Sequence, residues 1–249
     1  MHRYPNSRSL VEALSEHSSP RDHLSLIESF VIKDAFFSDE PELRDDVVAA
    51  ARLRTLEDGD RAGAVGDDER SITGLLDGNL TVWLPIHDGS LRPLHVLRAG
   101  SWTVSFPLLG GPSRRATLAA SGRTRLVHLD ETAVDRLVTA HPVLWRWIGR
   151  IAAEHLDRAL DVCAGLLADR PVPRIAGRLL ALVGENPGPH VPIDLKQSDL
   201  ALLSGLSRNT VSRTLGQLEA AGLIARGYRR LRVLDRHGLA RVAAGEDLG

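Results

Sequence analysis

The chain has 249 residues, of which 43% are apolar, and its 31 Lys and Arg residues nearly balance its 32 Asp and Glu residues. This length is sufficient to bury a core and to divide into two domains. The lone cysteine, Cys163, excludes an intrachain disulfide, a four-cysteine zinc site and a cysteine-ligated iron–sulfur cluster within one chain. No apolar run approaches the roughly 20 residues that span a bilayer, and residues 1–10 lack a signal-peptide pattern. We therefore expect a cytoplasmic protein without a membrane partner.

The charge is distributed unevenly along the chain. Residues 171–249 carry 11 Arg and Lys against 7 Asp and Glu, a net charge of +4, whereas residues 1–170 carry a net charge of −5. A basic end on an acidic body is typical of a nucleic-acid-binding domain joined to a different module. Ordinary variation of surface charge is the alternative.

The first 130 residues divide where the pattern of apolar residues changes. Residues 1–42 contain helical spacing, such as Leu24, Ile27 and Val31, and are a predicted helical lead-in. Residues 43–130 contain short alternating runs cut by glycines and acidic turns, which predicts an antiparallel barrel or sandwich. Within it we predict one hairpin around Asp88-Gly89-Ser90 and another around Ser121-Gly122.

Helical spacing returns over residues 131–170, with a long helix predicted from about Val143 to Asp169. A stripe of apolar residues at roughly 3.5-residue spacing follows this helix, and its small members would let two helices approach closely. The predicted dimer contacts are Ile148, Ala152, Leu156, Ala159, Cys163 and Leu166. The alternative is a helix packed on its own domain. The run Arg170-Pro171-Val172-Pro173 then breaks the helix and marks the boundary to residues 171–249.

The last domain contains a segment, Gln197 to Leu215, whose spacing fits a helix-turn-helix. Gly205 stands at the turn, and Ser207 is placed to cap the second helix by accepting from the backbone N–H of Asn209 or Thr210. The core between the two helices would consist of Leu200, Ala201, Leu206 and Val211.

The second helix leaves a polar face near its N-terminal end, where a recognition helix meets base edges. Arginine binds guanine through two hydrogen bonds and asparagine binds adenine similarly, each pair giving roughly 1–3 kcal/mol of discrimination. The predicted DNA contacts in this segment are Gln197, Ser207, Arg208, Asn209, Thr210, Ser212 and Arg213.

A basic hairpin follows the second helix. Gly222 is a predicted C-cap, and two short strands then flank Arg226-Gly227-Tyr228-Arg229-Arg230. Arg229 and Arg230 would neutralise phosphates without reading sequence. An ordinary helical hairpin is the alternative, but turn, cap, outward arginines and basic wing in this order favour a DNA-binding winged helix.

These motifs resemble the Crp/Fnr family of homodimeric transcription regulators over roughly Val48 to Val242. The resemblance is carried by Gly205-Leu-Ser-Arg-Asn-Thr-Val-Ser-Arg213 and Leu218-Glu-Ala-Ala-Gly-Leu-Ile224, at the family's recognition helix and wing entry. It implies an α+β fold: an N-terminal antiparallel β-barrel of the cyclic-nucleotide-binding type (a jelly-roll-like double-stranded β-helix), a long dimerisation helix, and a C-terminal winged helix-turn-helix.

The same resemblance assigns roles to particular residues of the predicted DNA-binding domain, residues 171–249, which we call the reading domain. Arg208 and Arg213 fall on the family's two DNA-contacting arginines. Asn209 replaces a commonly found glutamate, so the preferred base there should differ. Lys196 stands where a Ser or Thr would cap the first helix, and it adds a possible phosphate contact.

In the barrel, residues 108–117 resemble the family's phosphate-binding cassette, and Arg114 falls on the arginine that pairs with a cyclic phosphate. The glycine–glutamate pair that holds the ribose appears here as Val104-Ser105, which removes a charged acceptor. The resemblance thus implies a degenerate effector pocket that does not use cyclic AMP. The implied effector residues are Val104, Ser105, Arg114, Arg115 and Thr117, a solvated turn being the alternative for the two arginines.

The sequence therefore predicts a homodimeric, sequence-specific DNA-binding transcription regulator without catalytic residues, metal or cofactor. The predicted partners are double-stranded DNA with a palindromic operator, a second copy of the chain and, for an activator, RNA polymerase. A cyclic-nucleotide-responsive activator is one alternative. A cupin-like enzyme with an accessory winged helix is another, but it would need a metal cluster or an activated nucleophile that the barrel sequence does not contain.

Overall fold

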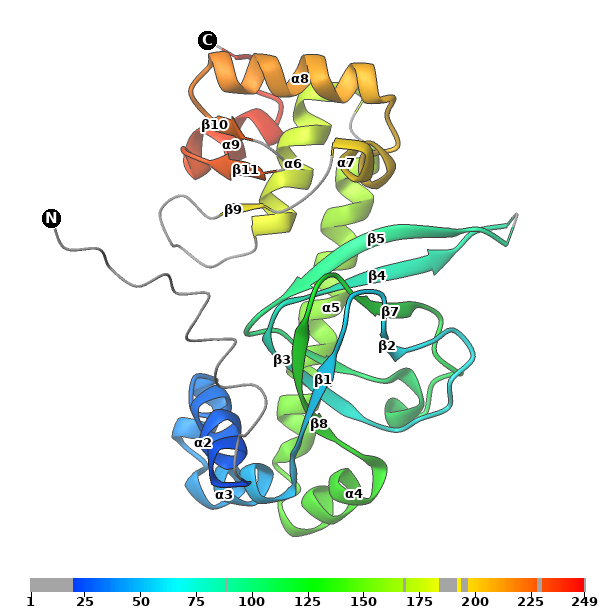
Figure 1. The fold of residues 1–249 in the computed structure, drawn as a ribbon, viewed down its shortest axis with the longest axis vertical. Helices are drawn as coiled ribbons and strands as arrows, with labels where there is room; N and C mark the ends of the chain where they lie inside the picture. Colours follow the sequence, from blue (N-terminus) through cyan, green and yellow to red (C-terminus); the bar gives the residue numbers. More distant parts are fainter. Residues whose placement is uncertain are drawn as a thin grey trace, which may run out of the picture.

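The computed structural model describes residues 20–87, 89–167, 169–183, 192–193, 197–227 and 230–248. An N-terminal helical segment leads into two facing sheets, which one long helix connects to a C-terminal domain (Figure 1). The elements in chain order are α2 (Pro20–Val31), η1 (Ala35–Ser38), α3 (Pro41–Ala50), β1 (Arg52–Leu56), β2 (Arg61–Gly63), β3 (Ile72–Asp77), β4 (Asn79–Pro85), β5 (Leu91–Arg98), β6 (Trp102–Val104), η2 (Phe106–Leu109), β7 (Thr117–Ala120), β8 (Thr124–Leu129), α4 (Glu131–Ala140), α5 (Leu144–Leu167), α6 (Pro171–Val183), β9 (Pro192–Ile193), α7 (Gln197–Ser204), α8 (Arg208–Ala220), β10 (Ile224–Gly227), β11 (Arg230–Val233) and α9 (Arg236–Ala243).

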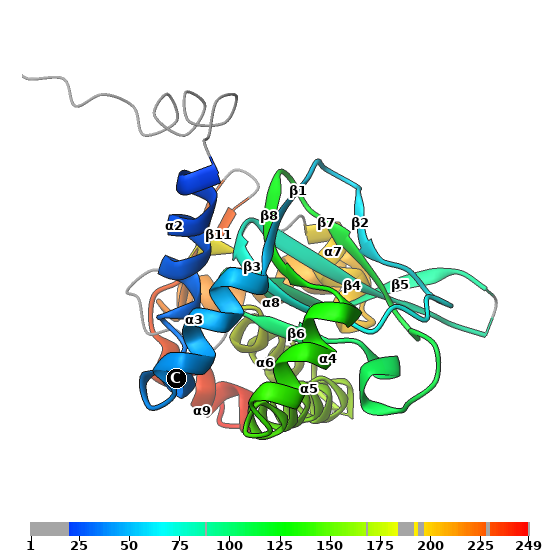
Figure 2. The ribbon, with the colours of Figure 1, turned by 90° about the horizontal axis from the view of Figure 1, so that it is seen from below.

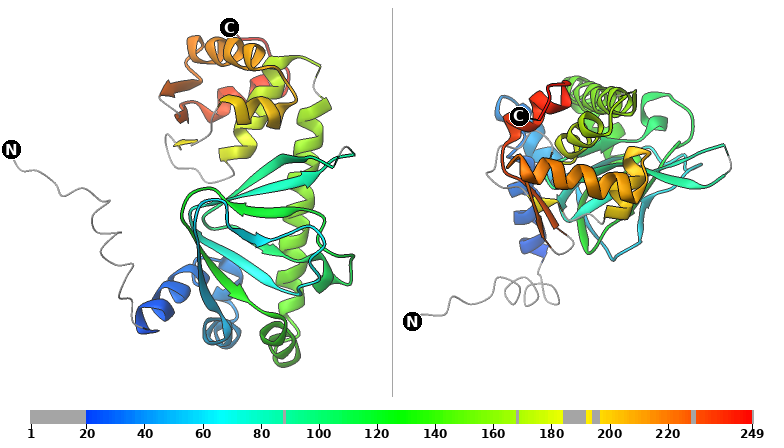
Figure 3. Two further views of the ribbon diagram at one scale, coloured as in Figure 1. Left: turned by 45° about the vertical axis from the view of Figure 1, so that its right-hand side comes forward. Right: turned by 90° about the horizontal axis from the view of Figure 1, so that it is seen from above.

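Two antiparallel four-stranded sheets form the barrel, which is open rather than fully closed (Figure 3). One sheet has the strand order β1-β8-β3-β6 and the other β2-β7-β4-β5. Neighbouring residues of β8 show where the sheets lie: Leu126 is in the core between them, whereas Val127 and Leu129 pack with the helices on the outer face. This is the alternation expected of a strand buried on both faces. The predicted α+β fold with antiparallel sheets is confirmed.

Of the two predicted hairpins, the one around Gly89 is confirmed and the other is wrong. β4 and β5 pair antiparallel from Asn79↔Arg98 to Pro85↔Leu91. β7, however, pairs with β2 and β4, while β8 pairs with β1 and β3, so the turn at residues 121–122 carries the chain from one sheet to the other. Apolar alternation identifies a strand but not its partner, because Leu118 of β7 and Leu126 of β8 face the same core from opposite sheets.

Helices α2, α3, α4 and the first half of α5 cover the outer face of the β1-β8-β3-β6 sheet (Figure 2). Trp102 lies at the centre of this packing, with ring centroids 4.8 Å from both Phe30 and Trp147. The Trp147 indole N–H donates to Asp34 at 2.9 Å, which satisfies its buried donor. The helical segment continues to Ala50, so the first strand starts later than the predicted barrel boundary at residue 43.

The C-terminal domain has its own core. Helix α6 packs with α8 and α9, and buried residues of all three meet there: Ile175, Leu179, Val211, Leu215 and Leu239. The small sheet β10-β11-β9 completes this core through Ile224 and Leu231. The predicted winged helix-turn-helix is thus present as two short helices followed by an antiparallel hairpin.

The two domains are joined by buried polar contacts as well as by α5. The guanidinium of Arg178 on α6, whose pKa is lowered by burial, donates to the carbonyl of Leu94 on β5 at 3.2 Å and to that of Leu203 on α7 at 2.6 Å. Arg98 on β5 donates through Nε to the carbonyl of Leu182 on α6. Together these bonds fix helices α6 and α7 against strand β5.

His95 of β5 lies inside this interface. Burial, followed by the positive charges of Arg158, Arg178, His155 and Arg98, lowers the pKa of His95 from 6.5 to about 4. The folded protein therefore holds this imidazole neutral at a pH at which the unfolded chain protonates it.

We predict that acid weakens the fold through His95. Its folded-state pKa is depressed, so its contribution is fully present above pH 6.5 and is lost as the pH falls toward 4, by about 3 kcal/mol in the free energy of unfolding. Urea unfolding at pH 7 and pH 4.5 measures this loss. The substitution His95→Gln should reduce the change in the free energy of unfolding between the two pH values, whereas His23→Gln on the exposed face of α2 should leave this change as it is. The same change in both variants would contradict the assignment to His95.

Candidate nucleic-acid interface

Helices α7 and α8 are joined by a tight turn that depends on Gly205. This residue has a φ of +63°, a left-handed conformation that glycine adopts at little cost. The N–H of Leu206 donates to the carbonyl of Ala201 at 3.0 Å and so closes the end of α7. Leu200 and Val211, both fully buried, lie on either side of the turn. The local sequence thereby sets the angle between the two helices.

Ser207 caps α8 as its sequence position suggests. Its backbone is extended, with φ −69° and ψ 152°, and its hydroxyl accepts from the N–H of Thr210 at 3.1 Å rather than from that of Asn209. The hydroxyls of Ser207 and Thr210 also lie 2.9 Å apart in a mutual hydrogen bond. A fixed helix N-terminus presents backbone N–H groups and the positive end of the helix dipole, which suits a phosphate.

The first two turns of α8 present a polar face to solvent. Arg208, Asn209, Ser212 and Arg213 are all exposed. The opposite face is anchored in the core through Val211, Thr214, Leu215 and Leu218. Helix α8 lies at the opposite end of the molecule from α3 and α4 (Figure 1). Four of the predicted base-reading and phosphate-contacting side chains thus lie together on one accessible surface.

The other predicted DNA contacts are placed less completely. Gln197 is exposed at the first position of α7. Lys196 and Arg229 lie outside the described residues. Arg230 begins β11, but its side chain is outside the described part of the structure.

Arg226, at the start of the basic hairpin, has a defined intramolecular partner. Arg226 donates through Nε to Glu219 on α8 at 2.6 Å, and its backbone N–H donates to the same carboxylate at 2.9 Å. The Arg226 guanidinium and N–H thereby lower the pKa of Glu219. This double contact holds the wing against the recognition helix. The C-cap of α8 is Ala221, one residue before the predicted Gly222, which has a left-handed backbone with a φ of +71°. The seven-residue separation of Glu219 and Arg226 across this turn is the only signal that the sequence offers for the pair.

The side chains of two predicted effector residues form hydrogen bonds with backbone N–H groups of another segment. Ser105 is 1% exposed, and its hydroxyl accepts from the N–H of Ser71 at 2.9 Å. The Thr117 hydroxyl, also buried, accepts from the N–H of Val65 at 3.2 Å. Val104 is half-buried beside the barrel–helix core, and Arg115 is exposed. The hydroxyls of Ser105 and Thr117 thus each bind a backbone N–H of a neighbouring segment.

Arg114 is the exception among the effector candidates. Burial lowers the pKa of its guanidinium, an effect that the nearby carboxylates of Glu69 and Asp67 partly offset. Its Nε is buried without a hydrogen-bond partner among the described residues. A Cβ at Gly63 would lie 2.6 Å from that Nε, so glycine at this strand position makes room for the guanidinium. Sequence reasoning missed Gly63, because a glycine in a strand signals a close approach without naming the approaching group.

Helix α5 presents three faces, and the structure corrects the predicted dimer stripe. Ile148 is fully buried in the barrel–helix core and Ala152 is half-buried, so the first half of the stripe packs on its own domain. Leu156 is 62% exposed, and Ala159 and Cys163 are exposed as well, whereas the side chain of Leu166 is outside the described part. The continuous exposed apolar face lies farther around the helix and shares only Leu156 and Cys163 with the predicted stripe. It consists of Gly149, Ala153, Leu156, Leu160, Cys163 and Leu167.

Within the described residues, no group of three or more His, Cys, Asp or Glu side chains is arranged to hold a metal ion. None of the described helices combines the length and apolar character required to cross a bilayer.

Comparisons with known proteins agree with this arrangement. The Crp-like helix-turn-helix domain family matches residues 173–242. The chain is 27% identical over 209 residues to the HTH-type transcriptional regulator Cmr of Mycobacterium tuberculosis, covering 80% of each protein. It is 28% identical over 181 residues to the Cyclic AMP receptor protein of Thermus thermophilus, covering 72% of this chain and 82% of that protein.

Solved structures show the same likeness. The crystal structure of a CRP-family transcriptional regulator from Thermus thermophilus matches with a TM-score of 0.58 and 25% identity over 79% of this chain and 98% of that one. The structure of FixK2 from Bradyrhizobium japonicum is similar in fold, with a TM-score of 0.62 at 21% identity over 79% of this chain and 99% of that one. The matched regions extend well beyond the reading domain, and they confirm the resemblance stated from the motifs. The chain therefore contains a Crp-like helix-turn-helix domain over residues 173–242, and it is similar in sequence and fold to transcription regulators of the Crp/Fnr family.

Proposed function

We propose that the protein binds a palindromic operator in double-stranded DNA as a homodimer, with α8 of each copy in a major groove. The observation that carries the proposal is the exposed set Arg208, Asn209 and Arg213 at the capped end of a helix whose other face is buried. Two such helices related by a twofold axis would read half-sites roughly 34–36 Å apart. If the protein activates transcription, RNA polymerase is a further partner.

The free face of α5 supports the homodimer. Leu156, Leu160 and Leu167 are 62%, 59% and 80% exposed, although they belong to a helix of 24 residues. With Gly149, Ala153 and Cys163 they alternate at spacings of four and three residues, the spacing of a two-helix seam. An aligned apolar row of this kind in water favours burial against a second copy.

The barrel supports an effector other than cyclic AMP. Val104 adds a side chain where the family has glycine, and the Ser105 hydroxyl is engaged with the backbone of Ser71. A ribose hydroxyl would therefore meet no carboxylate at this position, and the Ser105 hydroxyl that stands there is buried. Arg114 remains as a buried cation, which by itself binds anions without selecting a cyclic nucleotide.

We predict that Arg213→Ala weakens binding to the operator far more than binding to unrelated DNA. Selection from random double-stranded oligonucleotides identifies the operator, and fluorescence anisotropy then measures both affinities. Loss of a bidentate base contact should reduce operator affinity by about 5- to 150-fold, equivalent to roughly 1–3 kcal/mol, and relax specificity at one base pair. Arg241→Ala, which removes an exposed arginine from α9, is the matched control. Equal losses on operator and random DNA would contradict base reading by Arg213.

We predict that Leu160→Glu converts the protein to a monomer. A charge placed in the middle of the seam would have to be buried in each copy without a partner, which costs more than the apolar contact gains. Light scattering with size-exclusion chromatography measures the mass, and Leu24→Glu, at a similarly exposed leucine on α2, should leave the dimer intact. A dimeric Leu160→Glu variant would show that the copies associate elsewhere.

We predict that isothermal titration calorimetry detects no binding of cyclic AMP or cyclic GMP in the micromolar range. The reason is the missing ribose acceptor at Val104 and Ser105. Micromolar affinity for either nucleotide would support the cyclic-nucleotide-responsive alternative instead.

A further inference from the structure

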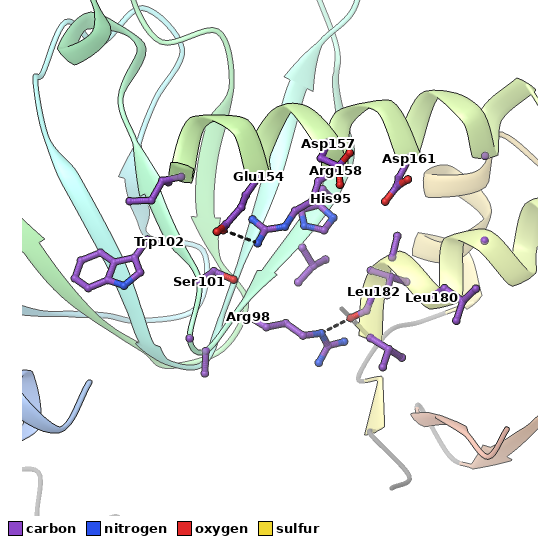
Figure 4. A pocket seen from close by; sticks show the side chains of 18 of the residues that line it. His95, Arg98, Ser101, Trp102, Glu154, Asp157, Arg158, Asp161, Leu180 and Leu182 are labelled. Carbon is purple, nitrogen blue, oxygen red and sulfur yellow. Dashed lines mark hydrogen bonds and ion pairs between the residues drawn. The ribbon is translucent and has the colours of Figure 1, made fainter. Parts of the chain in front are cut away.

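A cavity of about 980 Å³ lies where the barrel, helix α5 and the reading domain meet (Figure 4). Its walls come from the end of β5 and the turn into β6, from the middle of α5, and from the end of α6. Pockets for small molecules have volumes of roughly 300–1,000 Å³ and often lie at domain interfaces. The size and position of this cavity therefore suit a small ligand.

This cavity is separate from the effector region described above, because neither Arg114 nor Ser105 belongs to its lining. On α5 it borders the proposed dimer seam. Successive helical residues turn by about 100°, so Asp161 lies roughly 100° around the helix from Leu160, and Arg158 lies farther from the seam.

Basic groups from different elements converge at one end of the cavity. His95 and Arg98 enter it from β5, and Arg158 enters it from α5 (Figure 4). Burial, followed by the positive charges of Arg158 and Arg178, lowers the pKa of His95 to about 4. The imidazole is therefore neutral at physiological pH and can donate one hydrogen bond in a region of positive potential.

The charge of Arg158 is only partly compensated by its described contacts. Glu154 lies 3.6 Å from Nη2 of Arg158 and 3.1 Å from Arg150. The other terminal nitrogen of Arg158, Nη1, is buried without a hydrogen-bond partner among the described residues. An unsatisfied buried donor on a cation is costly, so a guanidinium in the cavity wall with such a donor favours an anion as the occupant.

The rest of the lining limits the kind of anion. Trp102, Leu180 and Leu182 provide apolar surface beside the basic end. Asp157 and Asp161 are exposed at the α5 wall and would repel a ligand that carries several negative charges. The lining thus combines one cationic end, an apolar surface and an acidic edge.

We propose that this cavity binds a small organic monoanion, a carboxylate with an apolar body, whose charged group lies against His95, Arg98 and Arg158. The site is new relative to the barrel pocket, and its occupant would contact both domains. Arg98 also bonds to the carbonyl of Leu182, so the ligand would bear directly on the contact between β5 and α6. Any effect on transcription rests on the proposed function, but binding itself does not.

The test uses the full-length protein labelled with 5-fluorotryptophan, with benzoate as the probe. The chain has four tryptophans, and single Trp→Phe variants assign their fluorine resonances. Benzoate should shift the Trp102 resonance saturably and leave that of Trp83 on β4 in place, because only Trp102 lines the cavity. Benzamide, which has the same shape without the charge, should bind at least tenfold more weakly. Inorganic phosphate should also bind more weakly than benzoate.

Two substitutions examine the charge requirement. Arg158→Gln should weaken benzoate binding at least tenfold, whereas Arg146→Gln, on the exposed first turn of the same helix, should not. Asp161→Asn removes a repelling charge without touching the basic end and should strengthen benzoate binding several-fold, which keeps the test decisive if Arg158→Gln fails to fold.

Four outcomes would overturn the proposal: no saturable shift with benzoate, equal affinity for benzamide, stronger binding of phosphate, or benzoate affinity unaffected by both Arg158→Gln and Asp161→Asn. All readouts come from the protein without DNA. A failure of α8 to bind an operator would therefore leave this result intact, and a failure of benzoate to bind would leave the DNA-binding proposal intact.

Discussion

The architecture depends on helix α5 meeting three environments at once. One face, with Ile148 and Ile151, is fully buried against the barrel and its covering helices. A second face, with Glu154 and Arg158, lines the interdomain cavity. The third carries Leu160 and its neighbours to solvent. A helix that is apolar over most of its surface is stable in water only when other elements cover those faces. The sheets and α6 cover two of them here, and the third is the face that we propose meets a second copy.

The junction between domains is built on a buried cation rather than on apolar contact alone. Arg178 is 6% exposed and has no carboxylate partner among its described contacts; two backbone carbonyls, of Leu94 and Leu203, accept from it instead. Because a buried charge without acceptors costs several kcal/mol, α6, α7 and β5 must be in place together for Arg178 to be satisfied. The orientation of the reading domain is thereby coupled to the position of a barrel strand.

The features that the sequence predicted well are those fixed within a few residues. The turn at Gly205 and the cap at Ser207 each depend on backbone groups three to five positions away, so spacing alone revealed them. Features that join distant segments were missed or misplaced. The partner of β7 depends on which sheet closes over Leu118, and Ile148 is buried because the barrel happens to cover that turn of α5. The contact between Arg178 and strand β5 was not predicted, because nothing near Arg178 in the sequence indicates which strand it meets.

These contacts bear on how an occupant of the cavity would reach the DNA. Only residues 168–170 separate α5 from α6, so the covalent link is short, and the remaining restraint on the reading domain comes from Arg98, Arg178 and the apolar contact of Val96 with its core. Half-sites at a fixed spacing of roughly 34 Å accept only one separation of the two α8 helices. A ligand changes the population of that arrangement only by the ratio of its affinities for the two arrangements, so a hundredfold change in operator affinity requires at least a hundredfold preference. A ligand at the basic end of the cavity would act directly on this junction, because Arg98 belongs to β5 whereas the carbonyl that it binds belongs to α6.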